Sequence, residues 1–274
     1  MLMRFIVRLI HRGTKLKRAF WHRVYETMAS RLTTNELVFM NYGWAPPEGD
    51  DSTLKLSETD EPRRRWAQLY HHITRDVDLE GQGVIEVGSG RGGGASFLAR
   101  TRKPATYMGI DYSDHAVRLC QSIHEVANLD FQQGDSENLP IEDGGVDVVV
   151  NVESSHCYGD LDKFVSEVAR VLKPGGVFCW GDLCAADQIS EVTKSLDSAG
   201  LVLERDEDIT QGVVRALSME GQARSALIAR LSPWFLRPTA RAFGGVPGTV
   251  VYKSLVDRRV VYLCRRYRKP SDSS

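Results

Sequence analysis

Cysteine is scarce in this chain, and the cysteines present show no pairing pattern. The five thiols are at positions 120, 157, 179, 184 and 264, and none belongs to a CxxC pair. Zinc ligation would require paired spacing with histidine partners. An odd number without pairs also argues against a disulfide framework. We therefore expect no metal site, reduced and mostly buried thiols, and a cytoplasmic protein.

Long apolar runs and a strong net charge are also missing. No stretch approaches the ~20 apolar residues that are needed to cross a bilayer. The formal net charge of −1 gives no overall attraction to nucleic acid, so we expect no nucleic-acid partner. The composition, 42% hydrophobic and 26% charged, is typical of an ordinary globular protein with a sizeable core.

Charge is uneven along the chain, because residues 1–31 carry eight basic residues and one acid, a net charge of +7. The apolar side chains of Leu2, Phe5, Ile6 and Leu9 share one helical face there. Three interpretations stay open: a helix packed on the catalytic domain, a membrane-surface helix, or an organelle transit peptide. The second would give peripheral membrane contact through residues 1–31.

Short apolar runs alternate with helical patterns between residues 81 and 184, which indicates βαβ units and a parallel sheet. The expected strands are 83–87, 106–110, 129–132, 147–152, 176–182, 201–204 and 259–265. The expected helices are 94–100, 114–127, 161–171, 189–199 and 210–231. The segment before residue 81 is expected to be helical apart from a loop at 44–56. The sequence therefore predicts an α/β fold with a doubly wound sheet of seven strands.

The turn after the first strand is rich in glycine and reads Glu86-Val87-Gly88-Ser89-Gly90-Arg91-Gly92. In a doubly wound sheet ligands bind at this turn, and glycine lets the backbone turn sharply and a ligand approach closely. Asp111 ends the next strand, 23 residues after Gly88, near the ~20 expected for a ribose-binding acid. These features predict a nucleoside cofactor. They suit a nicotinamide dinucleotide as well as a methyl donor.

Two further segments, Gly134-Asp135-Ser136 and the turn Leu172-Lys173-Pro174-Gly175-Gly176, complete an ordered series. The series resembles the motifs of class I S-adenosylmethionine (SAM)-dependent methyltransferases and implies a Rossmann-like sheet with SAM as cofactor. By this resemblance the methionine end lies among Glu86, Gly88, Gly90 and Gly92, the ribose on Asp111, and the adenine amino group on Asp135 with Ser136 beside it. Ser89, Tyr112 and Asn151 complete the predicted cofactor-binding set. The competing interpretation makes Asp111 and Asp135 helix-capping loop acids.

Methyl transfer to an alcohol needs a base, and histidine has a suitable pKa. His156 follows the fourth strand in Asn151-Val152-Glu153-Ser154-Ser155-His156, and Asp182 ends the neighbouring strand. The pair resembles the His and Asp of sugar O-methyltransferases of the rebeccamycin type, which implies that His156 is the general base and that Asp182 orients it. Alternatively, His156 hydrogen-bonds the backbone and Asp182 simply ends a strand. C- or N-methylation, in which positioning suffices, is the alternative reaction.

Several segments resemble a narrower group, the phthiotriolone and phenolphthiotriolone dimycocerosate methyltransferases. They are residues 35–41, 92–98, 151–158 and 245–249, and the similarity runs from about residue 15 onward. The resemblance implies O-methylation of a secondary metabolite, glycolipid or polyketide, a small-molecule or lipid-like acceptor. The glycine turn EVGSGRG and residues 1–13 depart from that group.

The same resemblance implies a lid and a cap around the SAM-binding core. The implied division is 1–80 (N-terminal helices and lid), 81–205 (core), 206–250 (substrate cap) and 251–274 (last strand and tail), within one structural domain. Tyr42 would lie in the lid near the sulfonium, whose charge attracts aromatic faces. Trp234, Phe235 and Phe243 would line an apolar acceptor pocket, although core packing explains such aromatics equally. The cap arginines, Arg224 among them, are expected to be solvated.

Overall fold

The computed structural model describes residues 37–50 and 54–271, and a seven-stranded sheet forms its centre. The strand order is β3-β2-β1-β4-β5-β7-β6. Neighbouring strands pair in parallel from β3 to β5, and β7 runs antiparallel to β5 and β6. The bounds are β1 Gly83–Val87, β2 Thr106–Asp111, β3 Leu129–Gln133, β4 Val146–Val152, β5 Leu172–Ala185, β6 Val202–Asp208 and β7 Val260–Arg268. The predicted α/β, Rossmann-like sheet is confirmed.

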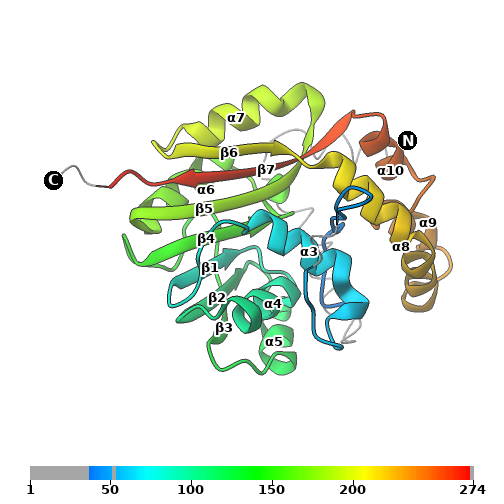
Figure 1. The fold of residues 1–274 in the computed structure, drawn as a ribbon, viewed down its shortest axis with the longest axis horizontal. Coiled ribbons are helices and arrows are strands. Elements are labelled where there is room, and N and C mark those ends of the chain that lie inside the picture. Colours follow the sequence, from blue (N-terminus) through cyan, green and yellow to red (C-terminus); the bar gives the residue numbers. More distant parts are fainter. Residues whose placement is uncertain (1–36, 51–53, 272–274) are drawn as a thin grey trace.

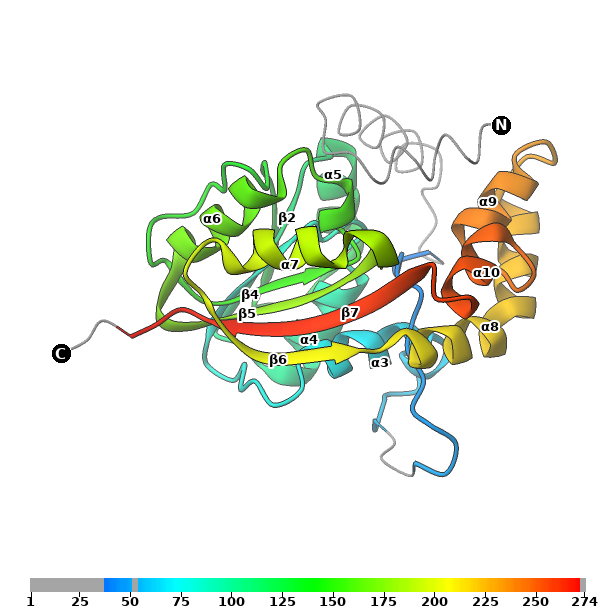
Figure 2. The same cartoon turned by 90° about the horizontal axis from the view of Figure 1, so that it is seen from above.

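Helices cover both faces of the sheet. One face carries α3 (Arg64–Ile73), α4 (Gly93–Arg102) and α5 (Asp114–Ile123), and the other carries α6 (Leu161–Val171) and α7 (Ile189–Asp197). Figure 2 shows α6 and α7 on the side of the strands opposite α3 and α4. A third group, α8 (Thr210–Leu231), α9 (Arg237–Phe243) and α10 (Val250–Val256), lies together at one end of the sheet (Figure 1). Short 3-10 helices span Glu61–Arg63, Ser155–Cys157 and Ala186–Gln188.

The central strands are buried on both faces, as parallel strands between helices must be. In β4 the side chains of Val148, Val150 and Val152 pack with α3 and α4, whereas Val149 packs on the opposite side with Phe164 of α6. Each fully buried valine contributes about 1.5–3 kcal/mol of transfer free energy. The apolar side chains thus hold the strands in register, and the polar residues that end them lie along one edge.

The turn at Pro174 and Gly175 interrupts the first part of β5. Val146 pairs with Leu172, but Val148 already pairs with Val177, so the register shifts between the two. Gly175 has a left-handed φ of +80°. β5 therefore begins four residues earlier than the sequence predicted, although the turn itself lies where expected.

Two secondary-structure predictions are wrong. Residues 37–50 contain no helix in the structure, and the described helix of the N-terminal region is α3, preceded by one 3-10 turn. α5 ends at Ile123 rather than Ala127, because His124 adopts an extended conformation and its Nε2 lies 2.8 Å from the carbonyl oxygen of Arg91. The predicted helix within residues 1–31 lies outside the described residues. No described helix has the length and apolar character of a membrane span.

Candidate active site

The glycine turn between β1 and α4 is held by the end of β2. The backbone N–H of Gly88 donates to the carbonyl of Ile110 at 2.7 Å, and the N–H of Gly90 donates to Oδ2 of Asp111 at 2.8 Å. Gly88, Gly90 and Gly92 have φ angles of +76°, +55° and +73°, where other L-residues are strained. The turn thus needs glycine for its backbone conformation at all three positions.

The three glycines differ in what lies beside them. A Cβ on Gly88 would lie 1.7 Å from Oγ of Ser154, and one on Gly92 would lie 2.6 Å from the Phe131 ring. Beside Gly90 the nearest atom is Sδ of Met40 at 3.8 Å. Gly90 is therefore the glycine with open space beside it, whereas a side chain at Gly92 would meet Phe131. The place of Gly92 around the methionine end of the cofactor stays a prediction.

The acids predicted to hold the nucleoside are brought together at the carboxyl ends of β2 and β3. Oδ1 of Asp111 accepts from the N–H of Ser113 at 2.9 Å, and the carbonyl of Asp111 accepts from the N–H of Gly134 at 3.0 Å. Asp135 follows directly, and its Oδ1 accepts from the N–H of Glu137 at 2.9 Å. Ser136 is half-buried beside it. Asp111, Asp135 and the glycine turn therefore share one edge of the sheet, as expected.

Two buried polar atoms at this edge have no hydrogen-bond partner among the described residues. They are Oγ of Ser89, in the glycine turn, and Oδ1 of Asn151, at the end of β4. The amide nitrogen of Asn151 is used, since it donates to the carbonyl of Val87 at 2.8 Å and to Tyr158 at 2.9 Å. Unpaired buried polar atoms are costly and mark places where a ligand can complete the hydrogen bonding. Both residues belong to the predicted cofactor set.

His156 and Asp182 form a buried pair beside this edge. Nδ1 of His156 donates to Oδ1 of Asp182 at 2.7 Å, and the backbone N–H of His156 donates to Oδ2 at 2.9 Å. Oδ2 also accepts from Oγ of Ser155 at 2.5 Å, and that hydroxyl accepts from Nε1 of Trp180 at 2.9 Å. The carboxylate is thus fixed by several donors, as an orienting acid must be.

The pair also sets the protonation of the imidazole. Burial lowers the pKa of His156, but the Asp182 charge and the hydrogen bonds to Asp182 and Cys157 raise it, so the net pKa is well above its usual value. Burial raises the pKa of Asp182, yet His156 and its other donors hold it below its usual value. The pair therefore favours an imidazolium beside a carboxylate, and His156 can accept a proton only when its imidazole is neutral.

Tyr42 joins the N-terminal segment to the site. Its N–H donates to Oε1 of Glu153 at 2.7 Å, and its hydroxyl donates to the carbonyl of Phe243 at 2.9 Å. Glu153 has a left-handed φ of +48°, and burial raises its pKa to about 7. Glu153 stands in the motif that contains His156 but was not among the predicted site residues, because its left-handed backbone and its burial are visible only in the structure.

Three predicted site residues lie elsewhere than expected. Glu86 is fully buried, where its carboxylate accepts from the hydroxyls of Tyr70 at 2.7 Å and Tyr107 at 2.8 Å. Glu86 thus lies beneath the glycine turn. Trp234 and Phe235 are 78% and 62% exposed, so they line no acceptor pocket in this structure. Tyr112, by contrast, is exposed at the cofactor edge, and Phe243 is half-buried behind Tyr42.

Arg224 is the other residue for which the expectation was wrong. It was expected to be solvated, but it is 9% exposed and its Nη2 donates to the carbonyl of Tyr42 at 2.7 Å. Burial lowers the pKa of this guanidinium, which the Glu153 carboxyl partly offsets. No cluster of three or more metal-ligating side chains occurs within the described ranges.

Known proteins match this chain in sequence and in fold. A family model described as a methyltransferase domain matches residues 78–223. The phthiotriol/phenolphthiotriol dimycocerosates methyltransferase of Mycobacterium tuberculosis is 39% identical over 250 residues, 91% of this chain and 92% of that protein. A fatty-acid O-methyltransferase of Mycolicibacterium smegmatis is 39% identical over 251 residues, 91% of this chain and 89% of that protein.

Solved structures with the same fold are more distant in sequence. The geranyl diphosphate C-methyltransferase of Streptomyces coelicolor, determined with geranyl diphosphate and S-adenosylhomocysteine, superposes with a TM-score of 0.62 at 17% identity, covering 89% of this chain and 98% of that one. A putative sarcosine dimethylglycine methyltransferase of Galdieria sulphuraria gives a TM-score of 0.69 at 16% identity, covering 84% and 93%. At such identities the likeness concerns the fold alone.

Proposed function

Because this chain belongs to the family of SAM-dependent methyltransferases, we propose that it methylates a hydroxyl group of a lipid-like acceptor with His156 as general base. SAM is its cofactor. The single observation that carries the proposal is the His156–Asp182 pair, whose Nδ1–Oδ1 distance is 2.7 Å at the carboxyl ends of β4 and β5. Relatives support the acceptor class, since one is named for dimycocerosates and another for O-methylation of a fatty acid.

The residues of the cofactor edge fit SAM. Asp111 offers a carboxylate for a ribose diol, Asp135 an acceptor for an adenine amino group, and Gly90 the open side of the glycine turn. The unpaired Oγ of Ser89 and Oδ1 of Asn151 are further polar atoms for it. When bound, the cofactor supplies a methyl group on a sulfonium that departs as a neutral thioether.

The chain's own residues then handle the proton. Since Nδ1 of His156 is committed to Asp182, Nε2 of the neutral imidazole is the position that takes the acceptor's hydroxyl proton as the oxygen bonds to the methyl carbon. The products are a methyl ether, the thioether and an imidazolium that Asp182 stabilises. Residues 1–80 and 206–250 would cover the acceptor side of the core at 81–205. Within the last predicted part, 251–274, the strand β7 (Val260–Arg268) belongs to the sheet.

Substitution of His156 tests the proposal. His156→Ala is expected to lower turnover of a long-chain alcohol by ~10²–10⁴-fold while SAM binding by calorimetry stays unchanged. His115→Ala, an exposed histidine on α5, is the matched control and should keep wild-type turnover. Wild-type turnover by His156→Ala would show that His156 is not the general base. That result would favour C- or N-methylation, in which positioning suffices.

A second candidate is methylation of a carboxylate oxygen, which needs no base. Asp182 raises the pKa of His156, and an imidazolium at this position suits a negatively charged acceptor group better than a neutral alcohol. Turnover of hexadecanoate and hexadecanol, measured as S-adenosylhomocysteine released, separates the two. A preference for the acid that survives His156→Ala would support the second candidate.

Membrane contact through the basic residues 1–31 is also part of the proposal, and these residues lie outside the described ranges. Sedimentation with anionic vesicles, with and without residues 1–13, tests it. Equal sedimentation would rule out a role for that segment.

A further inference from the structure

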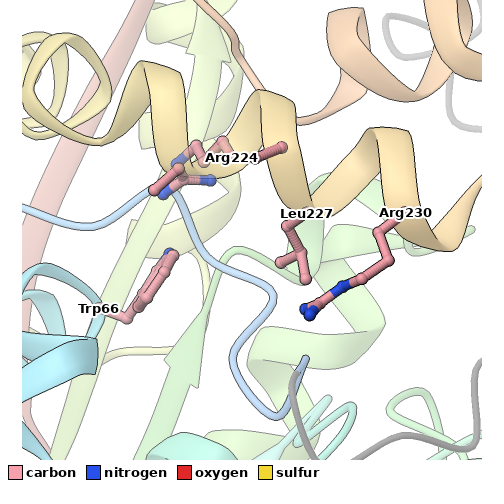
Figure 3. A pocket seen from close by; sticks show the side chains of 6 residues that line it. Trp66, Arg224, Leu227 and Arg230 are labelled. Atoms are coloured by element: carbon pink, nitrogen blue, oxygen red, sulfur yellow. The ribbon is translucent and has the colours of Figure 1, made fainter.

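A cavity of about 350 Å³ lies between α3 and α8, separate from the glycine turn. Its lining is Trp66, Ala223, Arg224, Ala226, Leu227 and Arg230. Figure 3 shows Arg224, Leu227 and Arg230 projecting from one face of α8 toward the side on which Trp66 lies. Their spacing of three residues places them on that common face. The volume falls in the range of small-molecule sites.

Arg224 is a buried cation in the wall of this cavity. It is 9% exposed, and its guanidinium donates to the carbonyls of Tyr42 at 2.7 Å and Asn41 at 3.4 Å, with its carbon 5.2 Å from the Trp66 ring centroid. Its Nε is buried and has no hydrogen-bond partner among the described residues. No ion pair joins it to a described carboxylate. Glu153 acts on this charge without a direct contact, and a buried guanidinium with an unpaired N–H is costly, which points to an anion that completes the site.

The rest of the lining defines the remainder of the ligand. Trp66, Leu227 and the two alanines are apolar, Arg230 adds a second cation, and none of the described residues that line the cavity is acidic. We infer that this cavity binds an amphiphile whose carboxylate or phosphate group pairs with Arg224 and Arg230, and whose acyl chain lies against Trp66 and Leu227. Binding of the amphiphile does not depend on the proposed function. Only its identification as the methyl acceptor rests on that function.

The cavity communicates with the catalytic pair through one residue. Arg224 holds the carbonyl of Tyr42, and the N–H of Tyr42 donates to Glu153, three residues before His156. An anion on Arg224 would therefore fix the segment that borders the active site. This link couples the occupancy of the cavity to the position of the segment that carries Glu153 and His156.

Quenching of Trp66 fluorescence tests binding without any methyl transfer. Bromine-labelled dodecanoate, below its micelle concentration and without SAM, should quench a saturable part of the emission, and Trp66→Phe should abolish that part. The neutral methyl ester of the same acid should bind on the order of tenfold more weakly, because it forms no charge-assisted bonds. Dodecyl phosphate as a competitor tells whether a phosphate replaces the carboxylate.

Substitutions identify the cations. Arg230→Gln, at an exposed position, should weaken dodecanoate binding on the order of tenfold, and Arg224→Lys should weaken it less than Arg224→Gln. Arg118→Gln, which removes the same charge from exposed α5, should have no effect. Unchanged affinity in both Arg230→Gln and Arg224→Gln, or saturable quenching that persists in Trp66→Phe, would overturn the assignment. Because SAM is absent, that failure would leave the proposed function standing.

A separate surface, the connection between α8 and α9, carries a second inference. Trp234, Phe235 and Leu236 are 78%, 62% and 43% exposed, and the two aromatic rings meet edge to face at 5.9 Å. Between Glu220 and Asp257 the sequence has no acidic residue and five basic ones, at positions 224, 230, 237, 241 and 253. Exposed aromatics next to basic residues are typical of surfaces that enter an anionic lipid interface.

We propose that residues 234–236 insert into an anionic lipid surface while the flanking arginines contact its headgroups. Binding to vesicles of phosphatidylcholine with phosphatidylglycerol should shift the Trp234 emission to the blue, and pure phosphatidylcholine should bind less protein. Trp234→Ala with Phe235→Ala should reduce sedimentation severalfold. Met219→Ala, at an equally exposed apolar position (61%) on α8, should not. Wild-type sedimentation by the double variant, or no binding by the wild type, would contradict the proposal.

Discussion

Nδ1 of His156 lies 2.7 Å from Oδ1 of Asp182, and the carboxylate that it meets is completely buried. Oδ1 also accepts from the N–H of Leu183 at 2.7 Å, and Oδ2 accepts from Ser155 and from the backbone of His156. A group with this many donors is rigid and ionised. The neutral imidazole is therefore held in one tautomer, with Nε2 as the acid–base position.

Asp182→Asn should separate the two roles of the carboxylate. We expect turnover of an alcohol to fall by ~10²–10⁴-fold, because the amide neither fixes the tautomer nor stabilises an imidazolium. The pH profile of kcat/KM should change as well. Asp182 raises the pKa of His156, so wild-type activity on an alcohol should increase with pH through a value above 6.5. In Asp182→Asn that rise should move to lower pH.

Two results would contradict this assignment. A wild-type profile that is flat through that range would show that no proton is removed by His156, as expected for a carboxylate acceptor. A variant whose profile keeps the wild-type midpoint would show that Asp182 does not set the pKa of His156. Leu183→Ala, next to Asp182 in β5, serves as a control for local packing.

Asp111→Asn should weaken SAM binding. The carboxylate now accepts from Gly90 and Ser113, and a ribose diol would add charge-assisted bonds worth about 1.5–3 kcal/mol each. We therefore expect calorimetry to show a roughly 10- to 100-fold higher dissociation constant for SAM and S-adenosylhomocysteine. Asp114→Asn, on the exposed first turn of α5, is the matched control. Unchanged SAM affinity in Asp111→Asn would place the ribose elsewhere, and selective binding of NAD would be incompatible with the ligand assignment.

The fold could be read from the sequence because its signals are local. Strands such as Val146–Val152 are mostly apolar, and the residues after them are polar, so the carboxyl edge of the sheet was predictable. Asp111, Asp135, His156 and Asp182 all lie along that edge as expected. The length of α5 was not predictable, because a contact 33 residues away, between His124 and Arg91, accompanies its end.

The site errors come from long-range burial, which no local pattern reports. Glu86 stands between two buried residues of a strand that is covered on both faces, so alternation could not show which way it points. Tyr70, 16 residues earlier, decides that. Burial at Trp234 and Arg224 is the opposite of what is usual for these residue types, because the tryptophan is exposed and the arginine is buried. Their positions depend on how α8 meets α3 and the segment at Tyr42.

Glu86→Gln should change how stability depends on pH. Burial raises the pKa of Glu86 to about 7, from 4.5 in the unfolded chain, although Tyr70 and Tyr107 partly oppose the shift. Between these values the folded state holds a proton that the unfolded state has lost, so stability falls as pH rises through this window. The cost at pH 8 is about 3 kcal/mol.

The glutamine carries no charge, so the variant should be more stable than the wild type at pH 8 and similar to it at pH 4.5. Urea unfolding at both pH values measures the difference. Glu153 remains in the variant, and burial also raises its pKa to about 7. The unfolding free energy of the variant should therefore still fall with pH, but less steeply than that of the wild type. Glu125→Gln, at an exposed position, should leave the profile unchanged. Equal stability of Glu86→Gln and wild type at pH 8 would mean that burial does not raise the pKa of Glu86.

Gly88→Ala should destabilise the glycine turn far more than a left-handed conformation alone requires. Both Gly88 and Gly144 have positive φ, but a Cβ on Gly88 would lie 1.7 Å from Oγ of Ser154, whereas nothing lies within 4 Å of one on Gly144. Gly144→Ala should therefore cost about 1–2 kcal/mol. Gly88→Ala should cost clearly more and weaken SAM binding, and Gly88→Ala with Ser154→Gly should recover part of both. Equal unfolding free energies for the two single variants would show that Ser154 yields freely, and that Gly88 is required only for its backbone conformation.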